Sequence, residues 1–377
     1  MSAPVIQGWC PGALRPMMSG DGLVVRIRPR AGRLTPAQAE GIARLSEKHG
    51  NGLLDLSSRA NLQLRGIGTG AHPALIEGLD ALGLIDASPE AEAMRNIMVQ
   101  PFWAEGDGTI RLAQMLATSL LDAPSLPGKF GFALDTGETP VLRTAPADIR
   151  IERDVDGRLI VCADGMATGA PATEGNLIDT VLELAEWFVA SGGIRDGRGR
   201  MAAHIASGAE PPAAFRKIQL QPPSNPPCPG LLPQGALVGF EFGQLTATDL
   251  GALARLGPLR LTPWRMLVIE GVRAMPQRPG LITDPGDPLL NVTACTGAPG
   301  CLQALGPTRE LARQLAPKVP GLHVSGCAKG CAHPGPSPVT VTATADGYDL
   351  IRNGRASDLP ERRGLSPEDL TSIFHAS

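Results

Sequence analysis

The segment GRLTPAQAEGIARL at residues 32–45 recurs, without a gap, as GQLTATDLGALARL at residues 243–256. Glycine, leucine, threonine, alanine, arginine and leucine return in register. The segments that lead into the two copies also match, because CPGAL at 10–14 corresponds to CPGLL at 228–232. Agreement of two separate segments in the same order indicates a divergent internal duplication and disfavours a chance likeness between two ordinary segments.

Each copy is predicted to form a strand, a helix and a second strand. Thr35 and Thr246 stand where a helix N-cap is expected. The flanking runs alternate between apolar and polar residues, as half-buried strands do. These runs are LVVRIR (23–28) and SRANLQLRG (58–66) around the first copy, and LVGFEF (237–242) and WRMLVIEG (264–271) around the second. Two such units, paired across a pseudo-two-fold axis, would form one central domain of an α+β protein.

A longer α/β stretch follows each unit. The first stretch is predicted to hold a helix at 109–121, a hairpin made of 148–153 and 158–163, and a helix at 176–191. Because residues 221–233 are rich in proline, we expect an extended linker between the halves of the chain. The predicted domains are residues 1–88, 89–220, 221–275 and 276–377.

Four of the seven cysteines gather in the last of these segments. Five residues separate Cys295 from Cys301, and three separate Cys327 from Cys331. Both pairs lie among Gly and Pro, where the backbone can bend around an inorganic centre. Cysteine thiolates are the usual ligands of iron–sulfur clusters. The four cysteines are therefore predicted to bind one [4Fe–4S] cluster.

Two other interpretations of these cysteines stay open. Structural zinc sites usually place two residues between the cysteines of each pair, so intervals of five and three fit zinc poorly. Disulfides need an oxidising compartment and are typical of small secreted folds. A chain of 377 residues with an odd number of cysteines and no recognisable signal peptide does not favour unligated or disulfide-bonded cysteines.

Bulk composition narrows the function classes. A formal net charge of −3 argues against a general nucleic-acid binder. Aromatic residues make up 3% of the chain, with a single tyrosine, so base-stacking platforms are not expected. No apolar run approaches the length of a membrane span. We therefore expect a soluble cytoplasmic protein without a nucleic-acid or membrane partner.

The duplicated unit and the cysteine spacing resemble the sulfite/nitrite reductase superfamily over nearly the whole chain. That likeness implies two ferredoxin-like half-repeats in a central domain plus two α/β lobes. Within the superfamily, three segments resemble the precorrin-3B synthase branch. They are CPGALRPMMSGDGL (10–23), LPGKFGFALD (126–135) and LTPWR (261–265).

The resemblance implies an oxidoreductase of the mono-oxygenase type. In that branch, molecular oxygen hydroxylates precorrin-3A, a metal-free tetrapyrrole, and the ring-A acetate closes as a γ-lactone to give precorrin-3B in aerobic cobalamin biosynthesis. The resemblance also implies the [4Fe–4S] cluster and a mononuclear non-haem iron. No G-x-G-x-x-G fingerprint follows a predicted strand, so we expect electrons from an external reductase.

Four cations, three arginines and one lysine, are predicted to contact the carboxylates of the macrocycle, and arginine suits this role because its guanidinium group grips a carboxylate bidentately. Arg59, Arg95 and Lys129 match cation positions in three motifs of the reductases, and Arg265 is added by pseudo-symmetry with the segment of Arg59. A basic cluster around the first strand is either a further set of carboxylate contacts or a solvated face. Its members are Arg26, Arg28, Arg30 and Arg33.

Departures from the reductase pattern weaken the second candidate function, which is a sirohaem-dependent sulfite or nitrite reductase. Gly128 and Gly131 stand where the reductase motif has an arginine and a second lysine. A third candidate is a cluster-containing sensor or assembly partner without catalysis. Ligands for the non-haem iron do not emerge, since no two histidines have helical spacing. His204 is a candidate ligand, and His333 is a candidate to tune the cluster by hydrogen bonding near it or else an exposed loop residue. Cys10, Cys162 and Cys228 are left unassigned.

Overall fold

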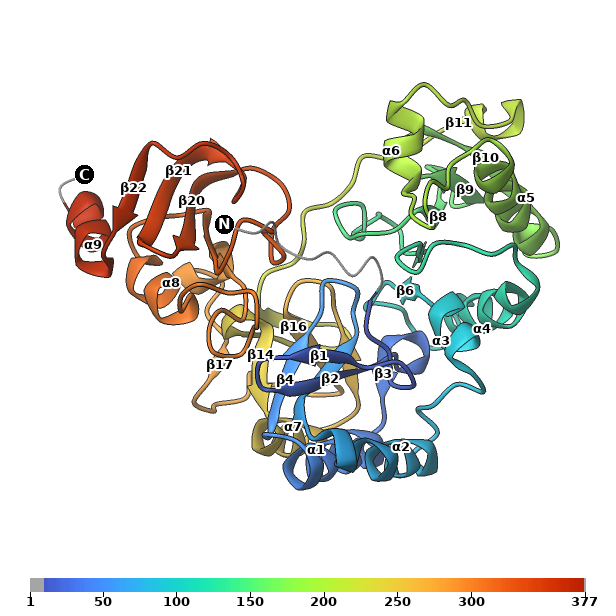
Figure 1. Cartoon of the computed structure of the whole chain (residues 1–377). Coiled ribbons are helices and arrows are strands. Elements are labelled where there is room, and N and C mark those ends of the chain that lie inside the picture. Colours follow the sequence, from blue (N-terminus) through green and yellow to red (C-terminus); the bar gives the residue numbers. More distant parts are fainter. Residues whose placement is uncertain (1–9, 376–377) are drawn as a thin grey trace.

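The computed structural model describes residues 10–375 and has a central body flanked by two lobes (Figure 1). Helices α1 (Pro36–His49), α2 (His72–Ala81) and α7 (Ala247–Ala254) lie beneath the central strands. The lobes stand above the central body on opposite sides, with the C-terminal lobe in red. In the described part of the chain, no helix is long and apolar enough to cross a membrane.

The central body consists of a five-stranded and a six-stranded sheet that exchange a strand. Their orders are β1-β2-β5-β4-β14 and β12-β13-β16-β15-β3. In the first, the strands are β1 Met17–Ser19, β2 Gly22–Ile27, β5 Leu62–Ile67, β4 Leu53–Leu56 and β14 Gln244–Thr246. In the second, they are β12 Gly230–Leu232, β13 Gly235–Phe240, β16 Met266–Glu270, β15 Leu259–Leu261 and β3 Arg33–Leu34, with β17 Leu281–Ile282 beside β13. Each unit therefore completes the sheet of the other.

The predicted duplication extends to the backbone angles. Thr35 and Thr246 both cap their helices with reciprocal capping boxes. Ahead of each cap, the chain bends through two residues of positive φ, Ala31 and Gly32 in the first unit. The second unit repeats the bend at Phe242 and Gly243. The sequence did not reveal the short inner strands β4 and β15, because three or four residues carry little periodicity.

The first lobe contains a six-stranded sheet of order β11-β10-β9-β8-β7-β6. Its strands are β6 Ile97–Val99, β7 Phe132–Asp135, β8 Ile149–Arg153, β9 Leu159–Ala163, β10 Thr168–Ala172 and β11 Ile218–Gln219. Its helices are α3 Pro89–Met94, α4 Thr109–Ser119, α5 Leu177–Ala190 and α6 Met201–Ala206. The predicted hairpin is confirmed, since β8 and β9 are antiparallel, and both predicted helices are present as α4 and α5.

The second lobe contains a five-stranded sheet of order β18-β19-β20-β21-β22. Its strands are β18 Thr293–Ala294, β19 Leu322–Ser325, β20 Ser337–Thr344, β21 Gly347–Gly354 and β22 Arg362–Leu365, and its helices are α8 Arg309–Leu315 and α9 Pro367–His375. After the first lobe, residues 221–229 form no helix or strand, as expected of a linker. The predicted linker extended to residue 233, and this end of it was wrong, because residues 230–232 pair with β13 as strand β12. The domain boundaries stay predictions.

Leu34 tests how strongly the exchanged strands couple the two units. It belongs to the first unit but is fully buried where β3 completes the second sheet. Leu34→Ala should lower the free energy of unfolding by about 2–5 kcal/mol. Urea unfolding followed by circular dichroism measures this loss. Leu256→Ala, at a leucine that is 47% exposed, should cost less than about 0.5 kcal/mol, and equal losses in both variants would contradict the coupling.

Candidate functional site

Sheet topology brings the two cysteine pairs together. Cys295 follows β18 directly, and Cys327 comes two residues after β19. These strands are parallel neighbours, so their carboxyl ends meet at one edge of the sheet. Cys301 and Cys331 lie further along the two loops that leave this edge. Pairs that are far apart in sequence thus converge because of strand order.

The four thiols lie within one another's electrostatic field. Burial raises the pKa of Cys327, and the thiols of Cys301 and Cys295 raise it further. Burial likewise raises the pKa of Cys331, and the nearby thiols raise this pKa further, namely those of Cys327, Cys295 and Cys301. Such a set gains from a cation or metal centre, which removes the mutual repulsion and holds thiolates.

Backbone amides point at these sulfur atoms. The amide of Gly326 donates to Sγ of Cys295 at 3.2 Å, and the amide of Lys329 lowers the pKa of Cys327 by hydrogen bonding. Four thiols with amide donors are the kind of donor set that [4Fe–4S] clusters use, in which each thiolate binds its own iron; that Cys295, Cys301, Cys327 and Cys331 bind such a cluster stays a prediction. Within residues 10–375, no three His, Cys, Asp or Glu side chains are grouped so as to hold one metal ion.

A buried histidine faces the second cysteine loop. His323 lies on β19, is fully buried, and has no hydrogen-bond partner at either ring nitrogen. Burial lowers its pKa to about 4, and His333 contributes to the shift. Its ring lies against Gly330, where an added Cβ would be 3.8 Å from its Cε1 atom. An orphaned buried imidazole is destabilising, so His323 suits a hydrogen bond to a group held by this loop.

Sequence reasoning selected His333 and missed His323. His333 lies in the loop, where its Nε2 atom is 3.3 Å from the carbonyl oxygen of Pro336. The rings of the two histidines are 5.7 Å apart. The available signal was the apolar strand LHVS, in which a histidine flanked by buried positions precedes Cys327 by four residues.

The first cysteine loop is fastened to the central body at Gly300. Its carbonyl oxygen accepts hydrogen bonds from the Ser19 hydroxyl at 2.6 Å, the Gly20 amide at 3.2 Å and the Arg65 guanidinium at 3.0 Å. These groups come from the end of β1, the turn that follows it, and β5. The peptide directly before Cys301 is therefore fixed by the central sheet.

Arg65 is itself held by two carboxylates. It pairs with Asp21 at 2.8 Å and with Asp55 at 3.1 Å, and its side chain is 5% exposed. Asp55 also contacts Arg309 of α8, at 3.4 Å. Nothing in the sequence marked Arg65, because its partners lie on three separate elements. This buried network joins the central body to the cysteine lobe.

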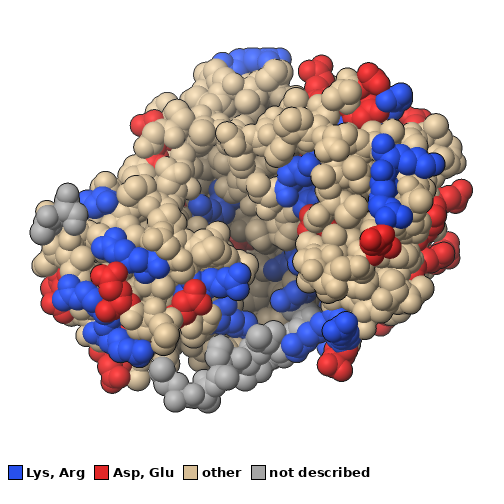
Figure 2. Space-filling view, turned by 90° about the horizontal axis from the view of Figure 1, so that it is seen from above, with Lys and Arg blue, Asp and Glu red and all other residues tan. Residues whose placement is uncertain are grey.

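A second cluster, of cations, surrounds Cys10. Burial alone would raise the pKa of this thiol, but Arg26, Arg59 and Lys129 outweigh burial and lower the pKa. Cys10 and Arg28 line a cavity of about 160 Å³. Figure 2 shows Lys and Arg side chains gathered around the hollow between the lobes. The structure thus brings the predicted contacts Arg59 and Lys129 together, along with Arg26 from the basic cluster.

Three of these arginines are held by different partners. Arg59 is half-buried and donates to the carbonyl oxygen of Lys129 at 2.9 Å. Arg26 donates to the side chain of Gln63 at 2.6 Å. Arg28 pairs with Glu92 at 3.1 Å. Their guanidinium groups are thereby oriented before any ligand binds, which lowers the entropic cost of gripping one.

Gly131 now has a structural explanation. A Cβ atom at this position would lie 2.8 Å from Nη1 of Arg59 and 2.7 Å from Nδ2 of Asn96. The Asn96 amide is bonded to the carbonyl oxygen of Phe130 at 2.8 Å. A reductase-type lysine at 131 would therefore displace Arg59 or Asn96.

The other two predicted cations lie elsewhere. Arg95 is held bidentately by Asp86, at 2.8 and 2.7 Å. Arg265 donates to the carbonyl oxygens of Val292 and Leu290, at 2.7 and 3.1 Å, and burial lowers its pKa. Its positive φ matches that of Ala60 in the first unit, so the residue at the place of Arg59 is Trp264. Contact of Arg95 and Arg265 with a macrocycle stays a prediction.

The Nε2 atom of His204 is 2.7 Å from the hydroxyl of Ser191. Of the unassigned cysteines, Cys162 is buried and Cys228 is exposed.

The cation cluster predicts an unusually reactive thiol. Because its pKa is lowered, more of Cys10 is thiolate at neutral pH than in an ordinary cysteine. The rate at which iodoacetamide modifies Cys10 should rise with pH, with a midpoint below the pKa of an ordinary cysteine. Arg59→Gln should move that midpoint upward. Peptide mass spectrometry measures both rates. Arg44→Gln, at an exposed arginine of α1, is the control, and identical midpoints in all three proteins would disprove the assignment.

Comparison with known proteins agrees with this architecture. Residues 15–82 match the family model described as the nitrite/sulfite reductase ferredoxin-like half domain. Over 404 aligned residues, the chain is 28% identical to a precorrin-3B synthase from Sinorhizobium sp, covering 95% of this chain and 85% of the relative. It is 26% identical to a ferredoxin–nitrite reductase from Synechococcus elongatus, covering 96% and 86%. The solved structure of NirA from Mycobacterium tuberculosis matches with a TM-score of 0.62 at 17% identity, covering 93% and 79%.

The fold is that of the sulfite/nitrite reductase-like proteins, and the fold class predicted from the sequence is confirmed. Within this class, the chain resembles precorrin-3B synthase along nearly its whole length, as its N-terminal motif predicted.

Proposed function

We propose that this chain hydroxylates precorrin-3A with molecular oxygen and closes the γ-lactone, giving precorrin-3B in aerobic cobalamin biosynthesis. The similarity to a precorrin-3B synthase over 95% of the chain supports the substrate class. One structural observation carries the proposal: oriented cations gather around Cys10 in a chain that also brings four thiols together at one sheet edge. Such a pair of sites suits a polycarboxylate ring and a redox centre.

In this mechanism, Arg26, Arg28 and Arg59 bind and orient the carboxylates of the macrocycle, with Lys129 at the exposed rim. A carboxylate that reaches Arg26 and Arg59 competes with the Cys10 thiolate for the same cations. Since those cations lower the pKa of Cys10, substrate binding raises that pKa and favours uptake of a proton at Sγ.

Cys295, Cys301, Cys327 and Cys331 would hold a [4Fe–4S] cluster, which supplies single electrons. Overall, one atom of O₂ enters the substrate, and the other leaves as water with two electrons and two protons. The electrons come from an external reductase, and the reaction is placed in the cytoplasm. A mononuclear non-haem iron is part of the same proposal, without assigned ligands.

The direct test supplies anaerobically purified protein with precorrin-3A, oxygen and a reductant. The product should gain one oxygen atom by mass spectrometry, and that atom should carry the label when ¹⁸O₂ is used. An unchanged substrate mass with an intact iron–sulfur centre would rule out the hydroxylase.

A sirohaem-dependent nitrite or sulfite reductase is the second candidate, because a ferredoxin–nitrite reductase is 26% identical over 96% of the chain. Gly128 and the crowding around Gly131 oppose it. The absorption spectrum separates the two candidates. The hydroxylase should show a broad iron–sulfur shoulder alone, whereas sharp sirohaem bands would favour the reductase.

The cluster assignment predicts the effect of losing single thiols. Cys301→Ser and Cys327→Ser should each lose most of the bound iron and sulfide, together with the brown colour, because a thiolate ligand is removed. Iron and acid-labile sulfide analysis measures this loss. Cys228→Ser, at an exposed cysteine outside both loops, should retain the wild-type content. Full retention in both ligand variants would contradict the assignment.

The cation assignment predicts a binding defect without loss of the cluster. Arg59→Ala should weaken precorrin-3A binding roughly tenfold to a hundredfold, because a charged hydrogen bond to a carboxylate is removed. Binding is measured by absorbance titration in the absence of oxygen. Arg44→Ala should bind as the wild type does. Unchanged affinity in Arg59→Ala would remove Arg59 from the site.

A further inference from the structure

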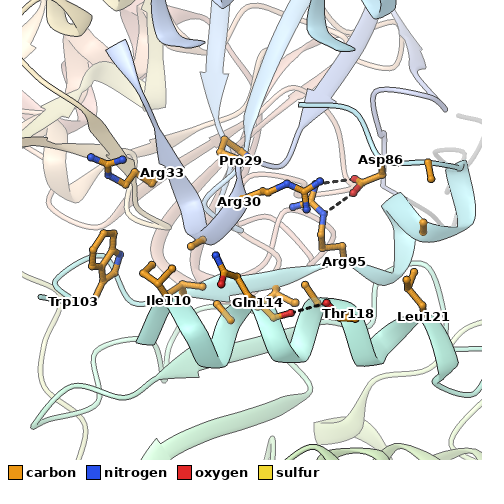
Figure 3. Close-up of a pocket in the computed structure, with 17 residues that line it drawn as sticks. Pro29, Arg30, Arg33, Asp86, Arg95, Trp103, Ile110, Gln114, Thr118 and Leu121 are labelled. Carbon is orange, nitrogen blue, oxygen red and sulfur yellow. Dashed lines mark hydrogen bonds and ion pairs between the residues drawn. The ribbon is translucent and has the colours of Figure 1, made fainter. Parts of the chain in front are cut away.

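A larger cavity lies outside both parts of the site described above. It has a volume of about 520 Å³. Figure 3 shows it between the chain that leaves β2, the segment around Asp86 and Arg95, and helix α4. No cysteine lines it, and neither do Arg59 and Lys129. A cavity of this size is within the range of small-molecule sites.

The walls of this cavity are mainly apolar. Helix α4 contributes Ile110, Ala113 and Ala117, and β6 contributes Ile97 and Val99. Of these, Val99 and Ala113 are buried, so the wall is part of a packed core and is preformed. An apolar body in the cavity would gain from burial against this wall.

The polar groups of the cavity favour an anion. Three arginines and one aspartate line it. Asp86 neutralises Arg95, and Glu270 holds Arg33 bidentately at 2.7 and 2.8 Å. Arg30 is exposed, and no carboxylate of the described chain pairs with its guanidinium. One cation is therefore left available at the rim.

The indole of Trp103 forms part of the same wall. Trp103 is 9% exposed, and its Nε1 atom is buried without a hydrogen-bond partner. The indole is fixed, because the Arg260 guanidinium stacks on it at 3.6 Å and donates to its backbone carbonyl. Its fixed aromatic ring therefore extends the preformed apolar wall of the cavity.

We propose that this cavity binds a small organic anion with a largely apolar, ring-containing body. Its acidic group pairs with Arg30, and its body lies along α4, β6 and the indole ring of Trp103. This site does not depend on the proposed hydroxylase activity or on the cluster.

Helix α3 connects this cavity to the cation cluster. Ala91 of α3 lines the cavity, whereas Glu92 of the same helix pairs with Arg28. Glu92 also accepts hydrogen bonds from the amides of Ala13 and Leu14, close to Cys10. An anion in the cavity thus lies one short helix away from the groups around Cys10.

A matched pair of fluorescent probes tests the proposal on the full chain. 8-Anilinonaphthalene-1-sulfonate carries the anionic group, and N-phenyl-1-naphthylamine is its neutral counterpart. The sulfonate should bind at one site, more tightly than the amine. Arg30→Gln should weaken the sulfonate about tenfold and leave the amine unchanged, because only the ion pair is lost. Arg111→Gln, on α4 but outside the cavity and paired with Glu174, should bind both probes normally.

The second part of the test is a variant whose larger side chain fills the cavity. Ala117→Phe should abolish binding of both probes while the circular dichroism spectrum stays unchanged. The proposal is overturned if Arg30→Gln binds the sulfonate as the wild type does, or if Ala117→Phe, folded, still binds either probe.

Discussion

The strand exchange between the two units is the constraint on which the molecule depends. Strand β14 of the second unit hydrogen-bonds to β4 of the first, and β3 of the first unit hydrogen-bonds to β15 of the second. The exchange covers β4 and β15, and it leaves at these edges only the short strands β14 and β3, which offer little for non-specific pairing. The exchange also packs α1 against α7 beneath both sheets. The two lobes are then attached to a single interlocked base.

Both parts of the proposed site use the same strand of this base. The turn before β2 contacts Gly300 in the first cysteine loop, whereas Arg26 and Arg28, at the far end of β2, belong to the cation cluster. At about 3.3 Å per residue, the six residues of β2 place these two contacts roughly 20 Å apart. The spacing between the cysteine lobe and the cations is therefore set by a rigid element.

Much of the fold could be predicted from the sequence, because helix caps and apolar alternation are local signals. The capping threonines and the long helices α4 and α5 illustrate this. The exchanged strands could not be predicted, since β3 has two residues and its partner is more than two hundred positions away. Short strands are chosen by tertiary pairing, not by their own composition.

The candidate site was predictable to the same extent. The cysteines stand out by spacing, and Arg59 and Lys129 by motif. Arg65 and His323 could not be selected from the sequence, because their roles depend on surroundings that form only in the folded chain. Arg265 shows the opposite case, in which a residue that looked equivalent by sequence is displaced by one position in the structure.

The interlocked base also has a consequence for synthesis on the ribosome. The edge of the first sheet at β4 is not covered until β14, which ends at Thr246, has emerged from the exit tunnel. The nascent chain therefore carries an uncovered strand while the whole first lobe is being translated. We therefore expect chaperones that bind exposed strand edges to bind this nascent chain during elongation.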